Sequence, residues 1–308
     1  MIVAPSTFRR QVRALTLAMT AMVVMPAPPL QARAAGPRLL DARAAELFRA
    51  ADAHGAVVVC NVATGDAPAA VGVGRDVAAR VLPLSAIKLY TAALWFARGL
   101  GDGAFSDPRH GRVTLHDALV LGYDRPAELA AIELRRRLGA HAVLEQLRGY
   151  GLTGLTLAPD ADDRAWGRTL SIGERDVTVT LREVAEFLRT APARTLDADL
   201  RAAVARGTAA SVARRLAGTG WQLGGKTGTG PKIVGPTSDG WFAGVIFEGD
   251  VPRYTLAVFV ERHGPGGGVA ASIAADLARS LAHGPGAAHP GAGRFSEHRP
   301  DLGKSGPI

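Results

Sequence analysis

Residues 83–99 read PLSAIKLYTAALWFARG. A proline opens the stretch, Ser85 follows closely, and Lys88 stands three residues later in a run rich in Leu, Ile, Tyr, Trp and Phe. Such a run predicts a helix over 84–99 that is buried on nearly every side. Because side chains three residues apart share one face of a helix, we expect Ser85 and Lys88 to lie together in its first turn.

Lysine is rare in this chain. Four lysines occur beside 32 arginines; one is Lys88, and another, Lys226, opens the sequence KTG at 226–228. Arginine keeps its proton in a protein, whereas a buried lysine can release it. We therefore interpret Lys88 and Lys226 as candidates for proton transfer.

Strand-like sequence dominates the last third of the chain. Residues 221–230 read WQLGGKTGTG, and the glycines would let a ligand or another backbone approach a strand closely. Two apolar runs follow at 240–247 and 254–260, and an alanine-rich helix is expected over 269–283. This order predicts an antiparallel sheet covered by a helix.

An early strand is expected over 55–62, and the region between the early and late strands is predicted to be helical. The expected helices are Thr114–Leu121, Pro126–Leu138, Ala140–Leu147, Thr180–Thr190 and Ala198–Leu216. The fold class is therefore α/β (α+β), with a sheet flanked by helices and joined to an all-helical lobe. We expect the active cleft between the two parts, where ligand sites commonly form.

Ser-x-x-Lys followed much later by Lys-Thr-Gly is the signature of penicillin-recognising serine enzymes. On Ser85, Lys88 and residues 226–228, the chain resembles the transpeptidase domain of penicillin-binding proteins. It is also similar to class D β-lactamases, which share that fold. The resemblance runs from about Gly55 to His283 and implies an antiparallel five-stranded sheet and no cofactor. The spacing of His and Cys residues suggests no metal site.

The resemblance implies catalytic roles for the side chains of Ser85, Lys88 and Lys226. Ser85 would be the nucleophile and would form an acyl-enzyme. Lys88 would be the general base, with its pKa lowered by burial and by the positive charge of Lys226.

The Lys-Thr-Gly strand would bind the substrate. Lys226 and Thr227 would hold the carboxylate of a D-Ala-D-Ala peptide or a β-lactam, and Gly228 and Thr229 would line the same strand. The backbone N–H groups of Ser85 and Thr229 would form the oxyanion hole. The expected partners are therefore peptidoglycan stem peptides and β-lactams.

The family carries a third motif between the other two, usually Ser-x-Asn. The matching segment here is GYDRPA at 122–127. Tyr123-Asp124-Arg125 aligns best, and both the Ser and the Asn are missing. Tyr123 still offers a hydroxyl near the proton path, so it is included among the catalytic candidates. Arg125 cannot replace an asparagine, which donates and accepts hydrogen bonds at once.

Three functions remain open. The first is an exported serine acyl-transferase, either a transpeptidase or a carboxypeptidase. The second is a class D-like β-lactamase, favoured by the small single domain and by Tyr150-Gly151, which matches two residues of the class D Tyr-Gly-Asn. The third is a non-catalytic binding or sensing protein, favoured by the incomplete third motif. Neither the acyl acceptor, water or an amine, nor the oligomeric state follows from the sequence.

The first 35 residues are predicted to be a signal peptide. Three arginines among residues 9–13 precede an apolar stretch over 14–25, and Ala32-Arg33-Ala34 offers a small-x-small cleavage site. The apolar stretch is short for a membrane span, although an uncleaved anchor is the alternative. The mature protein is therefore expected in the periplasm or outside the cell, with membrane contact only before cleavage. Arg9-Arg10 leaves the choice between general and twin-arginine export open.

The remaining chain is expected to form one domain over 36–283 and a disordered tail over 284–308. The net charge of +8 comes from scattered arginines and not from a long basic run, which argues against nucleic-acid binding. The single cysteine, Cys60, lies in an apolar run and is expected to be buried and inert.

Overall fold

The computed structural model describes residues 37–230, 238–262 and 268–283. Its centre is a five-stranded antiparallel sheet with the strand order β2-β1-β9-β8-β7. The strands are β1 (His54–Asn61), β2 (Ala69–Val73), β7 (Trp221–Thr229), β8 (Gly240–Glu248) and β9 (Val251–Glu261). The predicted sheet is therefore confirmed, and the strand with Lys-Thr-Gly lies at its edge.

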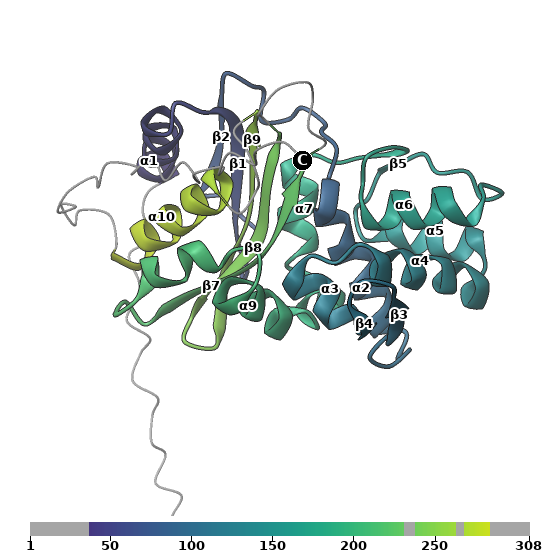
Figure 1. Ribbon diagram of the computed structural model, residues 1–308. Coiled ribbons are helices and arrows are strands. Elements are labelled where there is room, and N and C mark those ends of the chain that lie inside the picture. The colour runs from purple at the N-terminus through teal and green to yellow at the C-terminus, as the bar shows by residue number, and fades with distance from the viewer. Residues whose placement is uncertain (1–36, 231–237, 263–267, 284–308) are drawn as a thin grey trace, which may run out of the picture. The chain divides into compact units, whose positions relative to one another are not determined.

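Helices cover both faces of the sheet (Figure 1). Helices α1 (Pro37–Ala50) and α10 (Val269–His283) pack on one face, where Phe242, Ile246 and Val258 point into a shared core. Helices α2 (Ile87–Ala97) and α7 (Leu181–Phe187) share a core with the other face. Strands buried on both faces need apolar residues at successive positions, and this explains the continuous apolar run of β8.

A helical lobe adjoins α2. Its helices are α3 (Leu115–Leu121), α4 (Arg125–Leu138), α5 (Ala140–Gly149), α6 (Asp163–Ser171) and α8 (Ala191–Arg194). A capping box fixes the start of α3, because the Thr114 hydroxyl accepts from the Asp117 N–H and the Asp117 carboxylate accepts from the Thr114 N–H. Helix α2 is buried from Ile87 to Trp95, as its sequence predicts.

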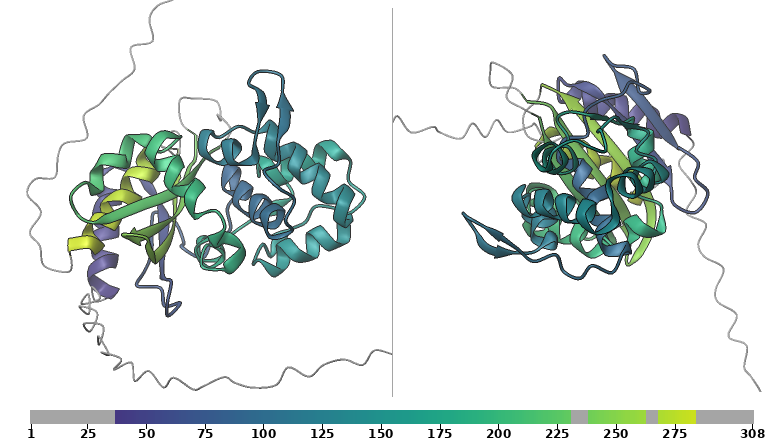
Figure 2. Two further views of the ribbon diagram at one scale, coloured as in Figure 1. Left: turned by 90° about the horizontal axis from the view of Figure 1, so that it is seen from below. Right: turned by 90° about the vertical axis from the view of Figure 1, so that its right-hand side faces the viewer.

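Two short strand pairs interrupt the lobe, which is otherwise helical as predicted. The pairs are β3 (Phe105–Asp107) with β4 (Gly111–Val113), and β5 (Gly154–Leu155) with β6 (Val177–Thr178). The β3–β4 hairpin projects away from the helices (Figure 2). Its turn is closed by the Asp107 carboxylate, which accepts from the backbone N–H groups of Arg109 and His110.

The helix expected over 198–216 is wrong as a single element. It consists of α9 (Asp197–Arg206) and the 3-10 helix η2 (Ala210–Leu216), separated by a turn at Gly207. A Cβ atom at Gly207 would stand 2.0 Å from the Val120 carbonyl oxygen. The turn therefore needs glycine, because the backbone after α9 approaches the end of α3 closely.

Several expectations concern the ends of the chain. The predicted signal peptide and C-terminal tail lie outside the described residues, so both remain predictions. Across the part of the chain that is described, no helix has the length and apolar character that crossing a membrane requires. Cys60 is fully buried in β1, as expected, and burial raises the pKa of its thiol; its lack of reactivity stays a prediction.

Candidate active site

Ser85 lies in a short 3-10 turn, η1 (Leu84–Ala86), that leads directly into α2. The residue before it, Leu84, has a left-handed backbone with a φ of 51°, which is rare for a bulky residue. Gly173 permits this geometry, since a Cβ atom there would stand 2.6 Å from the Leu84 carbonyl oxygen. Strained backbone of this kind persists where surrounding structure enforces it, and here it presents Ser85 at the start of α2.

Lys88 is fully buried, and its ammonium group connects two other polar side chains. Its Nζ atom donates to the Ser85 Oγ atom at 2.9 Å and to the Asp124 Oδ1 atom at 2.6 Å. The predicted meeting of Ser85 and Lys88 is therefore present in the structure. A lysine amine within hydrogen-bond distance of a serine hydroxyl has the geometry of a general base and its nucleophile.

Burial lowers the pKa of Lys88, as expected for a charged group removed from water. The carboxylates of Asp124 and Glu128 oppose this effect by stabilising the ammonium form. The direction agrees with the expectation, but its cause is burial alone, because the charge of Lys226 is not among the effects that act on Lys88. The balance between burial and Asp124 sets how readily Lys88 loses its proton.

Lys226 is the second buried lysine and lies in β7, with 1% of its surface exposed. Its Nζ atom donates to the Thr227 carbonyl oxygen at 2.9 Å. Burial, followed by the positive charge of Lys88, lowers the pKa of Lys226 to about 7. The charge of Lys88 therefore acts on Lys226, and near neutral pH the Lys226 amine exchanges its proton readily.

The Lys-Thr-Gly strand passes close to the nucleophile. A Cβ atom at Gly228 would stand 3.3 Å from the Ser85 backbone nitrogen and 3.0 Å from the Trp241 Cβ atom. The Trp241 indole N–H donates to the Leu82 carbonyl oxygen at 2.9 Å, which fastens the segment before Ser85 to β8. Glycine at 228 thus allows η1 to pack closely against β7. The predicted oxyanion hole, formed by the N–H groups of Ser85 and Thr229, needs this close approach.

The third motif contributes Asp124, a residue that sequence reasoning did not select. Asp124 reaches Lys88, whereas the ring of Tyr123 stacks on the imidazole of His110 at 3.9 Å between centroids. Arg125 forms an ion pair with Glu128 at 3.2 Å. The described contacts bring the Tyr123 hydroxyl to neither lysine, and its catalytic role remains a prediction. The sequence could have indicated Asp124 if Gly122-Tyr123-Asp124, and not Tyr123-Asp124-Arg125, had been aligned with Ser-x-Asn. In that alignment Asp124 takes the place of the Asn.

Thr227 lies beside a further hydroxyl. Its Oγ1 atom donates to the Oγ1 atom of Thr208 at 2.6 Å, and its side chain is otherwise buried. Thr208 belongs to the turn between α9 and η2 and is exposed. Thr229 is also exposed, at the end of β7. The predicted substrate-binding residues are consecutive in β7, and the hydroxyl of Thr208 lies next to that of Thr227.

Comparisons with known proteins agree with the fold. The sequence profile of the penicillin binding protein transpeptidase domain matches residues 186–279. The D,D-transpeptidase domain of a peptidoglycan glycosyltransferase from Eggerthella lenta has a TM-score of 0.62 at 18% sequence identity, covering 78% of this chain and 80% of that chain. The chain has a penicillin-binding protein transpeptidase fold. The resemblance inferred from the sequence is thereby confirmed.

Further penicillin-binding proteins share the fold. The apo transpeptidase domain of Burkholderia pseudomallei penicillin-binding protein 3 has a TM-score of 0.61 at 19% identity, covering 84% of this chain and 99% of that chain. Penicillin-binding protein 3 of Mycobacterium tuberculosis, complexed with aztreonam, has a TM-score of 0.57 at 19% identity, over 79% of this chain and 75% of that chain. No sequence among the curated proteins matches this chain.

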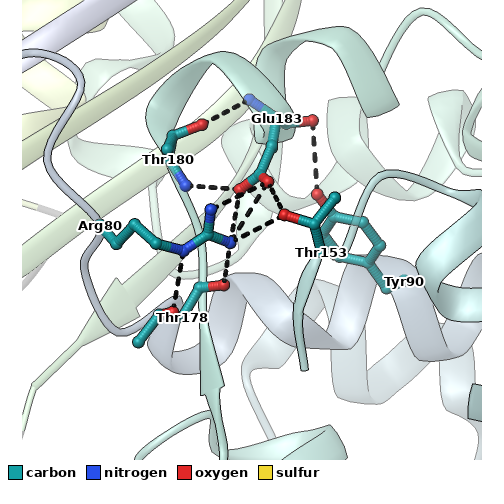
Figure 3. A network of polar contacts seen from close by, with 6 residues as sticks. All are labelled: Arg80, Tyr90, Thr153, Thr178, Thr180 and Glu183. Atoms are coloured by element: carbon teal, nitrogen blue, oxygen red, sulfur yellow. Dashed lines mark hydrogen bonds and ion pairs between the residues drawn. The ribbon is translucent and has the colours of Figure 1, made fainter. Parts of the chain in front are cut away.

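A network of polar contacts surrounds Arg80, five residues before Ser85 (Figure 3). The Arg80 guanidinium donates to both carboxylate oxygens of Glu183, to the Thr178 hydroxyl and carbonyl oxygen, and to the Thr153 hydroxyl. Glu183 also caps α7 through the Thr180 N–H and accepts from Thr153. The network holds the segment that leads to Ser85 against α7 and the β5–β6 pair.

Two features of this penicillin-binding fold lie apart from the Ser85 site. Tyr150, which suggested a class D motif, has its ring 5.9 Å from that of Phe187, and the described contacts do not link it to Ser85 or Lys88. A surface cavity of about 830 Å³ is lined by residues of α4 and α6, including Arg125 and Arg168, but by neither of the two buried lysines. The hydrogen bonds and burial of Ser85, Lys88 and Lys226 therefore identify the site better than this cavity does.

Proposed function

We propose that this chain is an exported serine acyl-transferase of the D,D-transpeptidase or carboxypeptidase type. The observation that carries the proposal is the hydrogen-bonded series Ser85, Lys88 and Asp124 beside the buried Lys226 of β7. A hydroxyl, a buried amine and a second buried amine in this arrangement supply a nucleophile, its base and a cationic group for substrate. The transpeptidase fold supports the same assignment.

In the proposed acylation, neutral Lys88 takes the proton of the Ser85 hydroxyl. The Ser85 Oγ atom then attacks the carbonyl carbon of a D-Ala-D-Ala peptide or a β-lactam. The backbone N–H groups of Ser85 and Thr229 stabilise the resulting oxyanion, and the bond to the leaving nitrogen breaks as that nitrogen receives the proton that Lys88 took from Ser85. Lys226 and Thr227 hold the substrate carboxylate, and the acyl group remains on Ser85 as an ester.

Asp124 has a distinct part in this scheme. When Lys88 takes the proton, it becomes an ammonium ion in a fully buried position, and an unpaired buried charge is costly. The Asp124 carboxylate, 2.6 Å from Nζ, compensates that charge. It also fixes the direction of the amine toward Ser85, as a third group orients the base in other nucleophilic enzymes.

A labelled penicillin tests the proposal. Purified residues 36–308 are incubated with the label, denatured, and compared with the Ser85→Ala variant by intact mass. We expect one covalent adduct per chain that is absent from the variant. If neither protein acquires the label and no penicillin is hydrolysed, the acyl-transferase proposal fails, and a binding or sensing protein that keeps the fold becomes the better account.

A β-lactamase is the second candidate, since Asp124 places a half-exposed carboxylate next to the proposed acyl-enzyme. The lifetime of the adduct separates the two candidates. An adduct that persists for many minutes supports a penicillin-binding transpeptidase or carboxypeptidase. Rapid hydrolysis of nitrocefin, with an adduct seen only transiently, supports the β-lactamase.

A further inference from the structure

Position 122 has no side chain, although it lies next to a buried lysine. Gly122 ends α3 with a left-handed backbone at a φ of 83°. A Cβ atom built there would stand 3.8 Å from the Lys226 Nζ atom. A serine at this position would therefore bring its hydroxyl to the Lys226 side of the site, and Gly122 supplies none.

Thr208 occupies the space in front of Gly122. Its Cγ2 atom lies 3.1 Å from the position that a Cβ atom at 122 would take, which is tighter than ordinary contact. Its Oγ1 atom is 2.6 Å from that of Thr227. Glycine at 122 and threonine at 208 are therefore complementary, because the threonine methyl group fills the room that a serine would need.

The backbone holds Thr208 in this place. The Thr208 N–H donates to the Val120 carbonyl oxygen at 3.4 Å, and Gly207 permits the close approach to the same oxygen. The turn after α9 is thus fastened to the end of α3, one turn before Asp124 begins the next helix. The hydroxyl of Thr208 is therefore positioned by two elements, and the residue as a whole is exposed to solvent.

We propose that Thr208 supplies the hydroxyl that Gly122 lacks and donates a hydrogen bond to the substrate carboxylate, while the Thr227 hydroxyl donates to Thr208. The proposal rests on the acyl-transferase function above. Two hydrogen-bonded hydroxyls carry two protons, of which one lies between them and the other remains to be donated. A carboxylate held by Lys226 would accept that second proton in a charge-assisted hydrogen bond. Hydroxyls arranged in series polarise each other, which strengthens the outer donor.

The proposed contact between Thr208 and the substrate carboxylate can be tested with a substrate in which that carboxylate is uncharged. The Thr208→Val variant keeps the shape and loses the hydroxyl, and Thr208→Ser keeps the hydroxyl as the matched control. The rate constant of acylation is measured with benzylpenicillin and with its uncharged methyl ester. For Thr208→Val we expect a loss on the order of tenfold or more with the acid and a change within about threefold with the ester. Thr208→Ser should remain near the unmodified chain with both.

A second variant restores the hydroxyl from the opposite side. Gly122→Ser combined with Thr208→Ala removes the methyl contact and places a hydroxyl at 122, so we expect it to recover acylation relative to Thr208→Ala alone. Equal loss with acid and ester, or no loss in Thr208→Val, would overturn the role of Thr208 while leaving Ser85 as nucleophile. If the unmodified chain reacts with neither compound, the acyl-transferase function fails, and the role of Thr208 falls with it.

Discussion

Two buried lysines set the chemistry of the site at the scale of single residues. Lys88 is oriented by a carboxylate, whereas Lys226 bonds to a neutral carbonyl oxygen. Because the positive charge of Lys88 lowers the pKa of Lys226, the two ammonium ions disfavour each other. The charge on Lys88 therefore favours the neutral form of Lys226.

The pH dependence of acylation tests the charge of Lys226. Its pKa of about 7 means that the ammonium form is lost as pH rises through that value. If the ammonium binds the substrate carboxylate, the acylation rate constant should fall above about pH 7. The Lys226→Arg variant keeps its charge and should lose this decline. Acylation rates are measured from pH 5 to 9, with thermal unfolding as a check of folding; identical profiles would contradict the role.

Folding stability gives an independent test of the same group. The folded chain holds the pKa of Lys226 near 7, below the ordinary 10.5, so the unfolded chain binds more protons between these values. The free energy of unfolding should therefore rise with pH across this range. Comparison with Lys226→Met isolates the effect from the net charge of the whole chain. The variant should show a smaller rise, and an equal rise would mean that Lys226 titrates normally.

Asp124 should control how the acylation rate constant rises with pH on the acidic side of its maximum. Its carboxylate raises the pKa of Lys88 against the effect of burial. Replacement by the isosteric amide in Asp124→Asn removes that charge, so Lys88 should lose its proton at lower pH. We expect the rising limb of acylation against pH to move toward acid, measured with the same labelled penicillin. An unmoved limb would show that Lys88 is not the base.

At the scale of elements, the network around Arg80 fixes the approach to Ser85. The Val81 N–H donates to the Val179 carbonyl oxygen at 2.8 Å, and the Val179 N–H returns a bond at 2.9 Å. Arg80 and Glu183 lie directly beside this isolated bridge. The segment before η1 is therefore attached by its backbone to Val179, just before α7, and by the Arg80 side chain to Glu183 in α7, which restricts the position of the nucleophile.

The Arg80→Met variant tests this support. Arg80 is partly exposed, so loss of its ion pair and hydrogen bonds should lower the free energy of unfolding by only about 1–2 kcal/mol. Acylation of Ser85 should also slow, because the segment before it is less restricted. The matched control is Arg182→Met, which removes an exposed ion pair with Glu186 on the same helix and should change stability by less than about 0.5 kcal/mol. Urea unfolding and acylation are measured on both, and equal behaviour would contradict the supporting role.

The sequence predicted those parts of the site that are local. Ser85 and Lys88 are three residues apart, so helical spacing alone predicts that their side chains meet. The contact between Lys88 and Asp124 joins distant segments, and the two possible alignments of the third motif, one residue apart, both lack the Ser and the Asn. Only the direction of the backbone after Gly122 shows that Asp124, and not Tyr123, faces the lysine. Thr208 was hidden for a related reason, since a helix was expected to continue through Gly207.

The larger elements were predictable where burial leaves a strong pattern. The strands β8 and β9 are buried along most of their length, and their continuous apolar runs predicted them well. Strand β2 alternates between buried and exposed residues, so its pattern is weak. The short α6 was missed because its apolar residues are few and are mixed with arginine and aspartate. The sequence therefore defined the centre of the sheet better than its surroundings.

At the scale of the whole molecule, export remains a prediction, because residues 1–35 lie outside the described part of the chain. Residues 1–35 fused to alkaline phosphatase, which folds actively only outside the cytoplasm, should give enzyme activity in bacterial cells. Replacing Arg9, Arg10 and Arg13 by glutamate should reduce it, since signal peptides begin with positive charge. Sequencing of the exported N-terminus should find cleavage after Ala34. Active fusion without cleavage would instead indicate an anchor.

The order of strands in the sheet also has a consequence for how the chain is made. Strand β1 pairs with β9 along its whole length, although the two come from opposite ends of the described fold. Ribosomes release β1 long before β9 exists, so the central sheet stays open throughout synthesis. Pairing of such distant segments is slow, because a long loop must close first. The central sheet, and with it the active site on β7, is therefore expected to be completed only after the end of the chain has been synthesised.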